Sequence, residues 1–362
     1  MSEAPRAPGP TIRGREKIVG EPPCYAALDL GTNNCRLLIA TPSHNGGFRV
    51  IEAYSRIVRL GEGLGASGRL SDDAMERAMA ALKVSGEKVR RRRVVKFRAI
   101  ATQACRIADN GQAFVNRVAN ETGVKLQIIS PQEEARLSVT GCLNLLDDRH
   151  EAALVVDVGG GSTELSWVDL KGGITAGVTP PVRAWLSVPI GVVTLAERFP
   201  EGDIATEGWF RQMVDHVKAE IFAFKRADPL RPLFAADRAH LVGTSGAITS
   251  LAGMHLQLPR YDRNRVDGIW MTRGECEAAA DGLLALTAAQ RAAQPCIGPD
   301  RADLVLAGAA ILQAVQEEWP CNRVRVADRG LREGILLSLM AERSQRRRRK
   351  RRRGRGGTKV AA

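Results

Sequence analysis

The sequence of 362 residues lacks any long hydrophobic run. No apolar stretch approaches the roughly 18 to 20 residues that a membrane helix requires, and one of the longest, LVLAGAAILQAV, has the length of a buried helix. The N-terminal segment also has no apolar core of the kind found in secretory signals. We therefore expect a protein without membrane contact.

Paired cysteines and histidine-based metal motifs are absent as well. The seven cysteines are scattered, odd in number and never spaced as C-x-x-C, and the five histidines show no H-E-x-x-H spacing. Such isolated cysteines are typical of reduced thiols, so we expect a cytoplasmic protein with neither a disulfide framework nor a zinc site. Any bound metal should then be held by carboxylate and phosphate oxygens, which favours Mg²⁺ as the cofactor.

Acidic residues are missing from the C-terminal end, where positive charge is concentrated. The formal net charge is +13, but eleven Lys and Arg residues follow Glu342, so the rest of the chain carries about +2. We expect residues 344–362 to form a disordered basic tail that binds a polyanion or RNA, or that only keeps the protein soluble. Residues 1–24, rich in Pro, Gly and Arg, are expected to form a disordered arm.

Glycines gather in turns that follow short apolar strands. In VVDVGGGSTELSW the run ends at Asp157 and three glycines follow, where a bare backbone allows main-chain N–H groups to approach a phosphate. The same layout begins at Asp29, and an offset of 128 residues also aligns Gly31 with Gly159. A third turn, GTSG, spans residues 243–246. A lone glycine triplet would suit an ordinary hairpin equally well, so the prediction of phosphate turns depends on the repeat.

Strands and helices alternate along the chain, which predicts an α/β architecture. The two copies of the strand–turn–strand pattern predict duplicated domains that face each other across a cleft. We place the first domain at residues 25–140 and the second at residues 141–325. A helix in residues 326–343 is expected to pack back on the first domain.

Seven short motifs occur in order along the chain: DLGTNNCRLLIA, ATQACR, SPQEEARL, DVGGGSTEL, SVPIGVVTL, GTSGAITSLAG and GLREGIL. Over roughly residues 25–337 they resemble the exopolyphosphatase/guanosine pentaphosphate phosphatase (Ppx/GppA) family, in its short two-domain form. The resemblance implies ribonuclease H-like domains of the sugar kinase–Hsp70–actin superfamily. It also implies a phosphoanhydride hydrolase that releases terminal orthophosphate from inorganic polyphosphate, converts pppGpp to ppGpp, or does both.

The motif SPQEEARL offers two candidates for a general base. Ser130 is a good N-cap and Pro131 a good first helical residue. Glu133 would then complete a capping box with Ser130, whereas Glu134 would not take part in capping. The alternative for Glu134 is a favourable interaction with the helix dipole. The resemblance assigns the catalytic role to the second acid, Glu134.

The remaining candidates would bind phosphate and metal. Arg106, at the end of an A-T-x-A-x-R motif, is expected to clamp phosphate, with a loop-capping surface arginine as the alternative. Asp29 and Asp157 are expected to hold Mg²⁺, and Glu164 would join them directly or through water, unless it is an exposed strand residue. The expected phosphate-binding residues of the three turns are Gly31, Thr32, Asn33, Asn34, Gly159, Gly160, Gly161, Ser162, Thr163, Gly243, Thr244, Ser245 and Gly246.

Two other functions stay open at this stage. An ATP-dependent kinase of a sugar or acid could share the fold, but it would need an acceptor pocket with a catalytic Asp in the second half. A non-catalytic regulator could bind ppGpp, or RNA through the basic tail, although the intact set of Asp29, Glu134 and Asp157 argues for catalysis. A homodimer is the base-rate expectation for a soluble oligomer.

Overall fold

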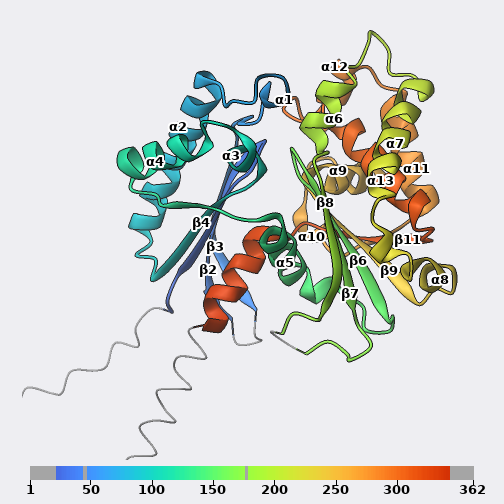
Figure 1. Cartoon of the computed structure of the whole chain (residues 1–362), viewed down its shortest axis with the longest axis horizontal. Coiled ribbons are helices and arrows are strands. Elements are labelled where there is room, and N and C mark those ends of the chain that lie inside the picture. The colour runs from blue at the N-terminus through green and yellow to red at the C-terminus, as the bar shows by residue number, and fades with distance from the viewer. Residues whose placement is uncertain (1–21, 44–46, 176–177, 343–362) are drawn as a thin grey trace, which may run out of the picture.

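The computed structural model describes residues 22–43, 47–175 and 178–342 as two α/β domains, each built on a mixed sheet (Figure 1). The expected basic tail at 344–362, and all but residues 22–24 of the expected N-terminal arm, lie outside the described residues. The two sheets stand side by side, and several helices lie on their outer flanks (Figure 1).

The first sheet has five strands in the order β3-β2-β1-β4-β5. The strands β1 to β3 come first in the chain and pair antiparallel. Strand β4 then pairs in parallel with β1, and β5 pairs in parallel with β4. The bounds are Tyr25–Leu30 for β1, Asn34–Pro42 for β2, Phe48–Ile57 for β3, Lys96–Ala101 for β4 and Leu126–Ile128 for β5.

Local signals in the sequence explain where the helices of this domain begin and end. Ser71 caps α2, because its hydroxyl accepts a hydrogen bond from the Ala74 N–H, and α4 ends where Gly123 adopts a left-handed conformation (φ 72°). Both helices bury their apolar faces against one side of the sheet. The helices are α1 Leu64–Ser67, α2 Asp72–Arg91, α3 Gln103–Ile107, α4 Gly111–Thr122 and α5 Pro131–Gly141.

The second sheet repeats the first. Its order is β10-β11-β9-β6-β7-β8, so β8, β7, β6, β9 and β11 correspond to β3, β2, β1, β4 and β5, with matching parallel and antiparallel pairs. The expected duplicated ribonuclease H-like fold is confirmed. The bounds are Ala152–Val158 for β6, Thr163–Asp169 for β7, Val182–Val188 for β8, Ala239–Thr244 for β9, Trp270–Thr272 for β10 and Arg323–Ala327 for β11.

The largest apolar core lies between this sheet and the helices of the second domain, where α13 is buried almost throughout. The apolar stretch LVLAGAAILQAV, which has the length of a buried helix, thus forms most of α13 in this core. The helices are α6 Val192–Arg198, α7 Glu207–Ile221, α8 Leu230–Ala235, α9 Gly246–His255, α10 Arg263–Val266, α11 Arg273–Leu284, α12 Ala288–Ala292 and α13 Val305–Glu318, with 3-10 turns η1 Leu143–Leu145 and η2 Lys225–Ala227.

Two helices connect the domains. One is α5; the other is a last helix over residues 331–342, which follows β11 in the chain and packs on the first sheet. They meet through their backbones, because a β-carbon on Gly141 would collide with the carbonyl oxygen of Gly330, and one on Gly334 with that of Leu137. Helix α5 contributes Leu137 to the core of the first sheet and Val139 to that of the second. The boundary expected after residue 140 therefore falls in a shared helix, and that expected after residue 325 falls inside β11.

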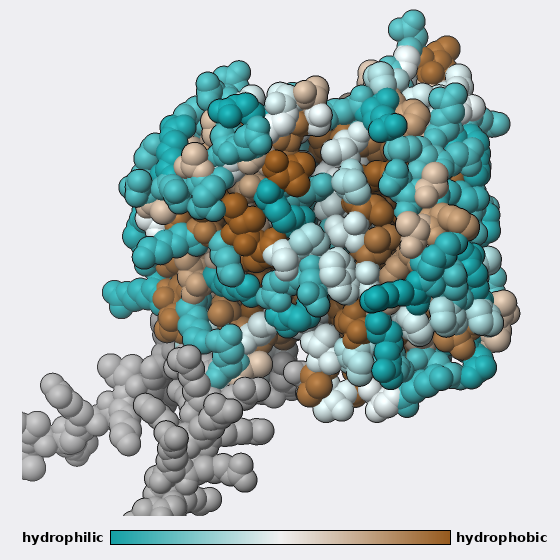
Figure 2. Space-filling view, viewed as in Figure 1, coloured by the Kyte–Doolittle hydropathy of each residue, from teal (hydrophilic) through white to brown (hydrophobic). Residues whose placement is uncertain are grey.

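The seven cysteines all lie in the described part of the chain, and each is free. In the same residues no helix is long and apolar enough to cross a membrane. On the face shown in Figure 2, hydrophilic residues cover most of the surface and hydrophobic residues lie in small groups between them.

Candidate functional site

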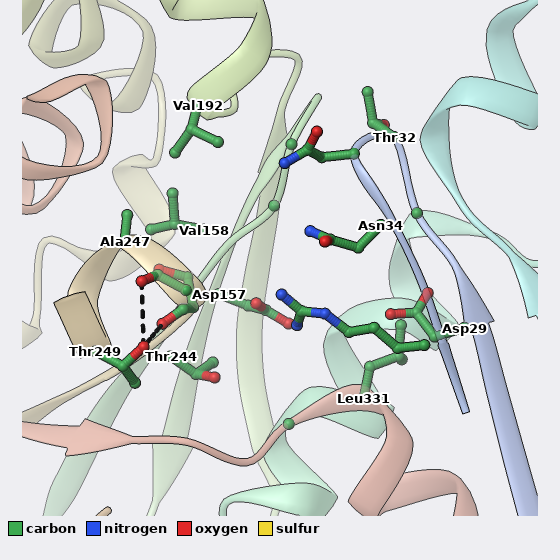
Figure 3. Close-up of a pocket in the computed structure, with 18 of the residues that line it drawn as sticks. Asp29, Thr32, Asn34, Asp157, Val158, Val192, Thr244, Ala247, Thr249 and Leu331 are labelled. Atoms are coloured by element: carbon green, nitrogen blue, oxygen red, sulfur yellow. Dashed lines mark hydrogen bonds between the residues drawn. The ribbon is translucent and has the colours of Figure 1, made fainter. Parts of the chain in front are cut away.

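A cavity of about 290 Å³ lies between the two domains, where the glycine turns meet (Figure 3). Asp29 enters from the first domain and Asp157 from the second, on opposite walls. Most residues that the sequence predicted as site residues line this cavity: Asp29, Gly31, Thr32, Asn33, Asn34, Glu134, Asp157, Gly159, Gly160, Gly161, Ser162, Glu164, Thr244, Ser245 and Gly246.

The two predicted phosphate turns share an equivalent backbone hydrogen bond. The Gly31 N–H donates to the Asn34 carbonyl at 2.8 Å, and the Gly159 N–H donates to the Ser162 carbonyl at the same distance. The glycines also allow the turns to touch each other. A β-carbon on Gly160 would lie 3.0 Å from the Asn33 nitrogen, so a side chain there would force the two domains apart.

Three acids from different elements converge at the cavity. Asp157 ends β6 and pairs across the hairpin with Glu164 on β7, while Glu134 comes from α5. Glu164 is 2 % exposed and accepts a hydrogen bond from Ser187 at 2.8 Å, so it is not the exposed strand residue of the alternative interpretation.

Burial raises the pKa values of all three acids, and their mutual repulsion adds to the effect. The pKa of Asp157 rises to about 6, mainly through burial, although the hydrogen bond from Ser138 opposes the shift. Burial and then the charge of Asp157 raise the pKa of Glu164, and burial and then Glu164 raise that of Glu134 well above its usual value. The protein itself therefore leaves negative charge here without full compensation.

The two glutamates at the start of α5 have different surroundings. The Ser130 hydroxyl accepts a hydrogen bond from the Glu133 N–H at 3.2 Å, as expected of an N-cap. In a capping box the Glu133 carboxylate would also accept a hydrogen bond from the Ser130 N–H. Here this carboxylate instead pairs with Arg136 at 2.8 Å and Arg98 at 3.1 Å. Glu134 instead turns inward and is 7 % exposed.

Three predicted site residues do not line the cavity. Arg106 lies behind Glu134 and donates to its carboxylate at 3.1 Å and to the Ile129 carbonyl at 2.8 Å, which orients the acid. Thr163 donates to the Ile190 carbonyl at 2.7 Å. Gly243 is packed against Ile248 inside β9, where a β-carbon would lie 2.8 Å from that side chain.

The cavity also contains arginines that the sequence reasoning did not assign: Arg36, Arg301, Arg329 and Arg332. Arg36 and Arg301 approach each other over the start of α9, since a β-carbon on Gly246 would lie 3.7 Å from both guanidinium groups. Within the described residues neither guanidinium group makes a hydrogen bond or an ion pair. Burial and then the charge of Arg332 lower the pKa of Arg36, and Asp29 and Asp328 oppose this shift only in part.

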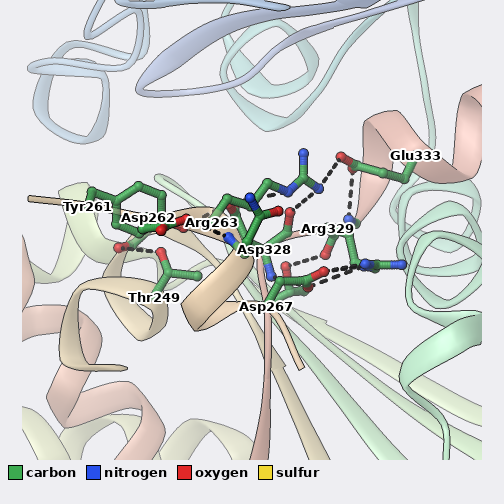
Figure 4. A network of polar contacts seen from close by, with 12 residues as sticks. Thr249, Tyr261, Asp262, Arg263, Asp267, Asp328, Arg329 and Glu333 are labelled. Atoms are coloured by element: carbon green, nitrogen blue, oxygen red, sulfur yellow. Dashed lines mark hydrogen bonds and ion pairs between the residues drawn. The ribbon is translucent and has the colours of Figure 1, made fainter. Parts of the chain in front are cut away.

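A polar network anchors the segment that leads into the last helix (Figure 4). Arg329 pairs with Asp267, and Glu333 accepts from Arg263 and from the Gly330 N–H, both at 3.0 Å. Burial opposes ionisation of Glu333, but Arg332 and Arg263 outweigh it and lower its pKa. This wall of the cavity is therefore held by ion pairs, in contrast to the unpaired arginines opposite.

Residues 39–343 match the model of the Ppx/GppA phosphatase family. The chain belongs to this family. It is similar to exopolyphosphatase 2 of Mycobacterium tuberculosis, at 29% identity over 327 residues, which cover 87% of this chain and 98% of that protein. The Ppx/GppA chain described here thus has the short form that the motifs predicted.

Solved structures of relatives share the fold. The Ppx/GppA family member of Aquifex aeolicus matches with a TM-score of 0.73 at 29% identity, covering 89% of this chain and 98% of that one. An exopolyphosphatase from Cytophaga hutchinsonii matches with a TM-score of 0.76 at 24% identity, covering 88% and 98%. At that lower identity the second match supports the fold alone.

Two of the arginines that sequence reasoning missed carried a signal. The repeat offset of 128 residues places Arg36 at the position of Glu164, and both follow a phosphate turn in their hairpins. Arg332 belongs to GLREGIL, one of the motifs of the Ppx/GppA resemblance. Arg301 belongs to no motif, and only the folding of the chain brings it to the cavity.

The described residues offer fewer protein ligands for Mg²⁺ than the three that the sequence predicted. Within the described ranges, no group of three or more acidic, histidine or cysteine side chains is arranged to hold a metal ion. Asp157 and Glu164 are nevertheless adjacent and incompletely compensated, and Asp29 Oδ1 is buried without a hydrogen-bond partner. Mg²⁺ is commonly bound by one or two carboxylates together with substrate phosphates. The residues therefore fit an ion that binds together with a phosphorylated substrate.

Proposed function

We propose that this Ppx/GppA chain hydrolyses a terminal phosphoanhydride bond and releases orthophosphate from inorganic polyphosphate, from pppGpp or from both. The observation that carries the proposal is the pair of unpaired arginines, Arg36 and Arg301, in the same cavity as the glycine turns and the buried acids. Close guanidinium groups repel each other unless an anion lies between them. A phosphate chain supplies that anion.

The glycine turns would hold the terminal phosphate. Residues 31–34 and 159–162 line the cavity from both domains. The N–H groups of Gly31 and Gly159 bond within their turns, so other N–H groups of the turns would donate to the phosphate, and Thr32 and Ser162 would add hydroxyl groups. Donors that are already in place stabilise charge that develops during phosphoryl transfer. Because the turns belong to different domains and lie in contact in this structure, both sets of donors can reach one phosphate.

Glu134 would act as the general base. Its raised pKa makes it a better proton acceptor than an ordinary carboxylate, and Arg106 holds its orientation. A water molecule between Glu134 and the terminal phosphate would lose its proton to this carboxylate as it attacks phosphorus. Glu133 has no comparable position, since it is held outside by Arg98 and Arg136.

Asp157 and Glu164 would hold Mg²⁺ together with phosphate oxygens, with Asp29 facing them from the other domain. When bound, the ion would offset the negative charge of the acids and of the phosphate chain. Asp157→Asn should therefore remove both activity and its dependence on Mg²⁺. An unchanged midpoint in a Mg²⁺ titration of the residual activity would exclude the ligand role.

Phosphate release measured in parallel from long-chain polyphosphate, pppGpp and ATP tests the proposal. We expect release from polyphosphate or pppGpp by the wild-type protein, loss of it in Glu134→Gln, and near-normal release in the matched control Glu133→Gln. The ranking of the substrates then distinguishes polyphosphate from pppGpp. Absence of release from both substrates, or transfer from ATP to an acceptor, would contradict the proposed hydrolase.

A further inference from the structure

Ser138 faces the second domain from the same side of α5 as Glu134. The two residues are four positions apart, which places them one turn apart on one helix face. Ser138 is 2 % exposed, and its hydroxyl donates a hydrogen bond to Asp157 Oδ2. One face of a connecting helix thus presents both the proposed base and a partner of the proposed metal ligand.

The direction of this hydroxyl is unusual within the molecule. Serine and threonine hydroxyls inside helices commonly donate to the carbonyl four residues earlier. Ser85, Thr122, Thr140 and Ser250 all do so here, at 2.8 Å each. Ser138 instead donates away from its own helix and across the domain junction to a carboxylate on β6.

Asp157 depends on this contact for its orientation. In the described part of the chain, Ser138 makes the one hydrogen bond to the Asp157 carboxylate. Arg36 acts on it electrostatically, without a hydrogen bond between the two side chains among the described residues. With Oδ2 engaged by the hydroxyl, the other carboxylate oxygen is left for a cation.

We propose that Ser138 is a positioning residue, which holds the Asp157 carboxylate in the orientation that binds a divalent cation. The inference rests on the proposed function, because it takes Asp157 as a metal ligand. Hydrogen bonds of this kind orient ligating carboxylates, and their loss typically weakens metal binding by about 10- to 100-fold. Ser138 would act only through Asp157 and would not touch the substrate.

Mn²⁺ binding tests this role without any measurement of turnover. Binding is measured by electron paramagnetic resonance at saturating orthophosphate for the wild-type protein, Ser138→Ala and Ser85→Ala. The control removes an equally buried hydroxyl that bonds within α2 and does not line the cavity. We expect Ser138→Ala to bind Mn²⁺ about 10-fold or more weakly and Ser85→Ala to match the wild type.

Kinetics of the same variants separate positioning from a general loss of structure. In Ser138→Ala, saturating Mg²⁺ should restore most of kcat, and KM for the phosphate substrate should stay near the wild-type value. Wild-type Mn²⁺ affinity in Ser138→Ala would overturn the proposal, provided that Asp157→Asn loses the ion. If Asp157→Asn also retains wild-type affinity, Asp157 is not a metal ligand, and the positioning role of Ser138 is then refuted as well.

Discussion

At the scale of single residues, the two neighbouring glutamates of α5 show how one position in a helix decides a role. Glu133 lies on the outer side, paired with two arginines, whereas Glu134 points into the cavity beside Glu164. Both follow the same N-cap, so neither helix propensity nor capping distinguishes them. Their difference is which face of the helix meets the second domain.

Replacement of Glu134 by Gln should lower kcat by about two to four orders of magnitude, which is the usual contribution of a general base. The amide cannot accept the proton, but it retains the size of the side chain and its hydrogen bond to Arg106. Steady-state kinetics and thermal unfolding of Glu134→Gln and Glu133→Gln measure the effect. A greater loss of kcat in Glu133→Gln would refute the assignment of the base.

The raised pKa of Asp157 also predicts how stability depends on pH. Its folded-state pKa, about 6, lies above its ordinary value of 3.8, so folding favours the protonated form. The stabilising contribution of the protonated form is present below about pH 4 and is lost as pH rises through 6; a shift of this size corresponds to roughly 3 kcal/mol. We therefore expect Tm of the metal-free protein to fall between about pH 4 and pH 6.

Thermal unfolding in that interval, without and with Mg²⁺, checks this prediction. Asp157→Asn should flatten the pH dependence, because the amide does not ionise. Mg²⁺ should stabilise the wild-type protein at neutral pH more than it stabilises the variant, since a ligand that binds only the folded state raises its stability. A wild-type Tm that rises over the same interval would contradict the prediction.

At the scale of elements, the crossing of α5 with the last helix connects the two domains. The helices approach so closely that a β-carbon on Gly141 would collide with the Gly330 carbonyl, and one on Gly334 with the Leu137 carbonyl. The crossing also places Glu134 and Ser138, on one helix, and Arg332, on the other, around the same cavity. The relative position of these groups therefore depends on backbone contact between two helices.

Gly141→Ala should destabilise the protein and reduce activity together, because the new methyl group would collide with the rigid Gly330 carbonyl. Overpacking of this kind typically costs about 1 to 3 kcal/mol. Gly282→Ala on α11 is a matched control, since a β-carbon there meets no atom within 4 Å. The control should stabilise α11 by up to about 1 kcal/mol. Equal Tm values for the two variants would show that the crossing tolerates a side chain.

At the scale of the whole molecule, net charge gives a poor description of where charge acts. Outside the residues after Glu342 the chain carries only about +2. The structure places four arginines at the cavity, but six acids line it as well, so the positive charge is local and the cavity as a whole has no basic excess. The basic tail would supply the field that attracts a long polyanion.

Removal of the tail after Glu342 should raise KM for long polyphosphate and flatten its salt dependence. The tail lies outside the described residues, but the helix that precedes it begins at the cavity and spans about 18 Å. A basic segment tethered there raises the local concentration of a long polyanion. Turnover at saturation and activity on pppGpp should change little.

Measurements with long and short chains at two salt concentrations decide the role of the tail. If the full-length and truncated proteins have equal KM for long chains, the tail does not contribute to substrate binding. Binding of RNA by the full-length protein alone would instead assign the tail to a nucleic acid.

The sequence by itself determined the duplicated architecture, and most of the site residues that it predicted line the cavity. Strand–turn–strand units, the N-cap at Ser130 and the left-handed glycine that ends α4 depend on neighbours within a few residues, so short patterns reveal them. The repeat then implied that two turns face each other. What remained a prediction from the family resemblance is the chemical role of each residue.

The tertiary structure decided which side chains meet. Arg36 and Arg301 converge over Gly246, and Ser138 reaches Asp157, although each pair belongs to distant parts of the chain. It also brought Arg106 to the Glu134 carboxylate, Thr163 to the Ile190 carbonyl and Gly243 against Ile248. No local pattern encodes such contacts, because the packing of two sheets and two crossing helices determines them.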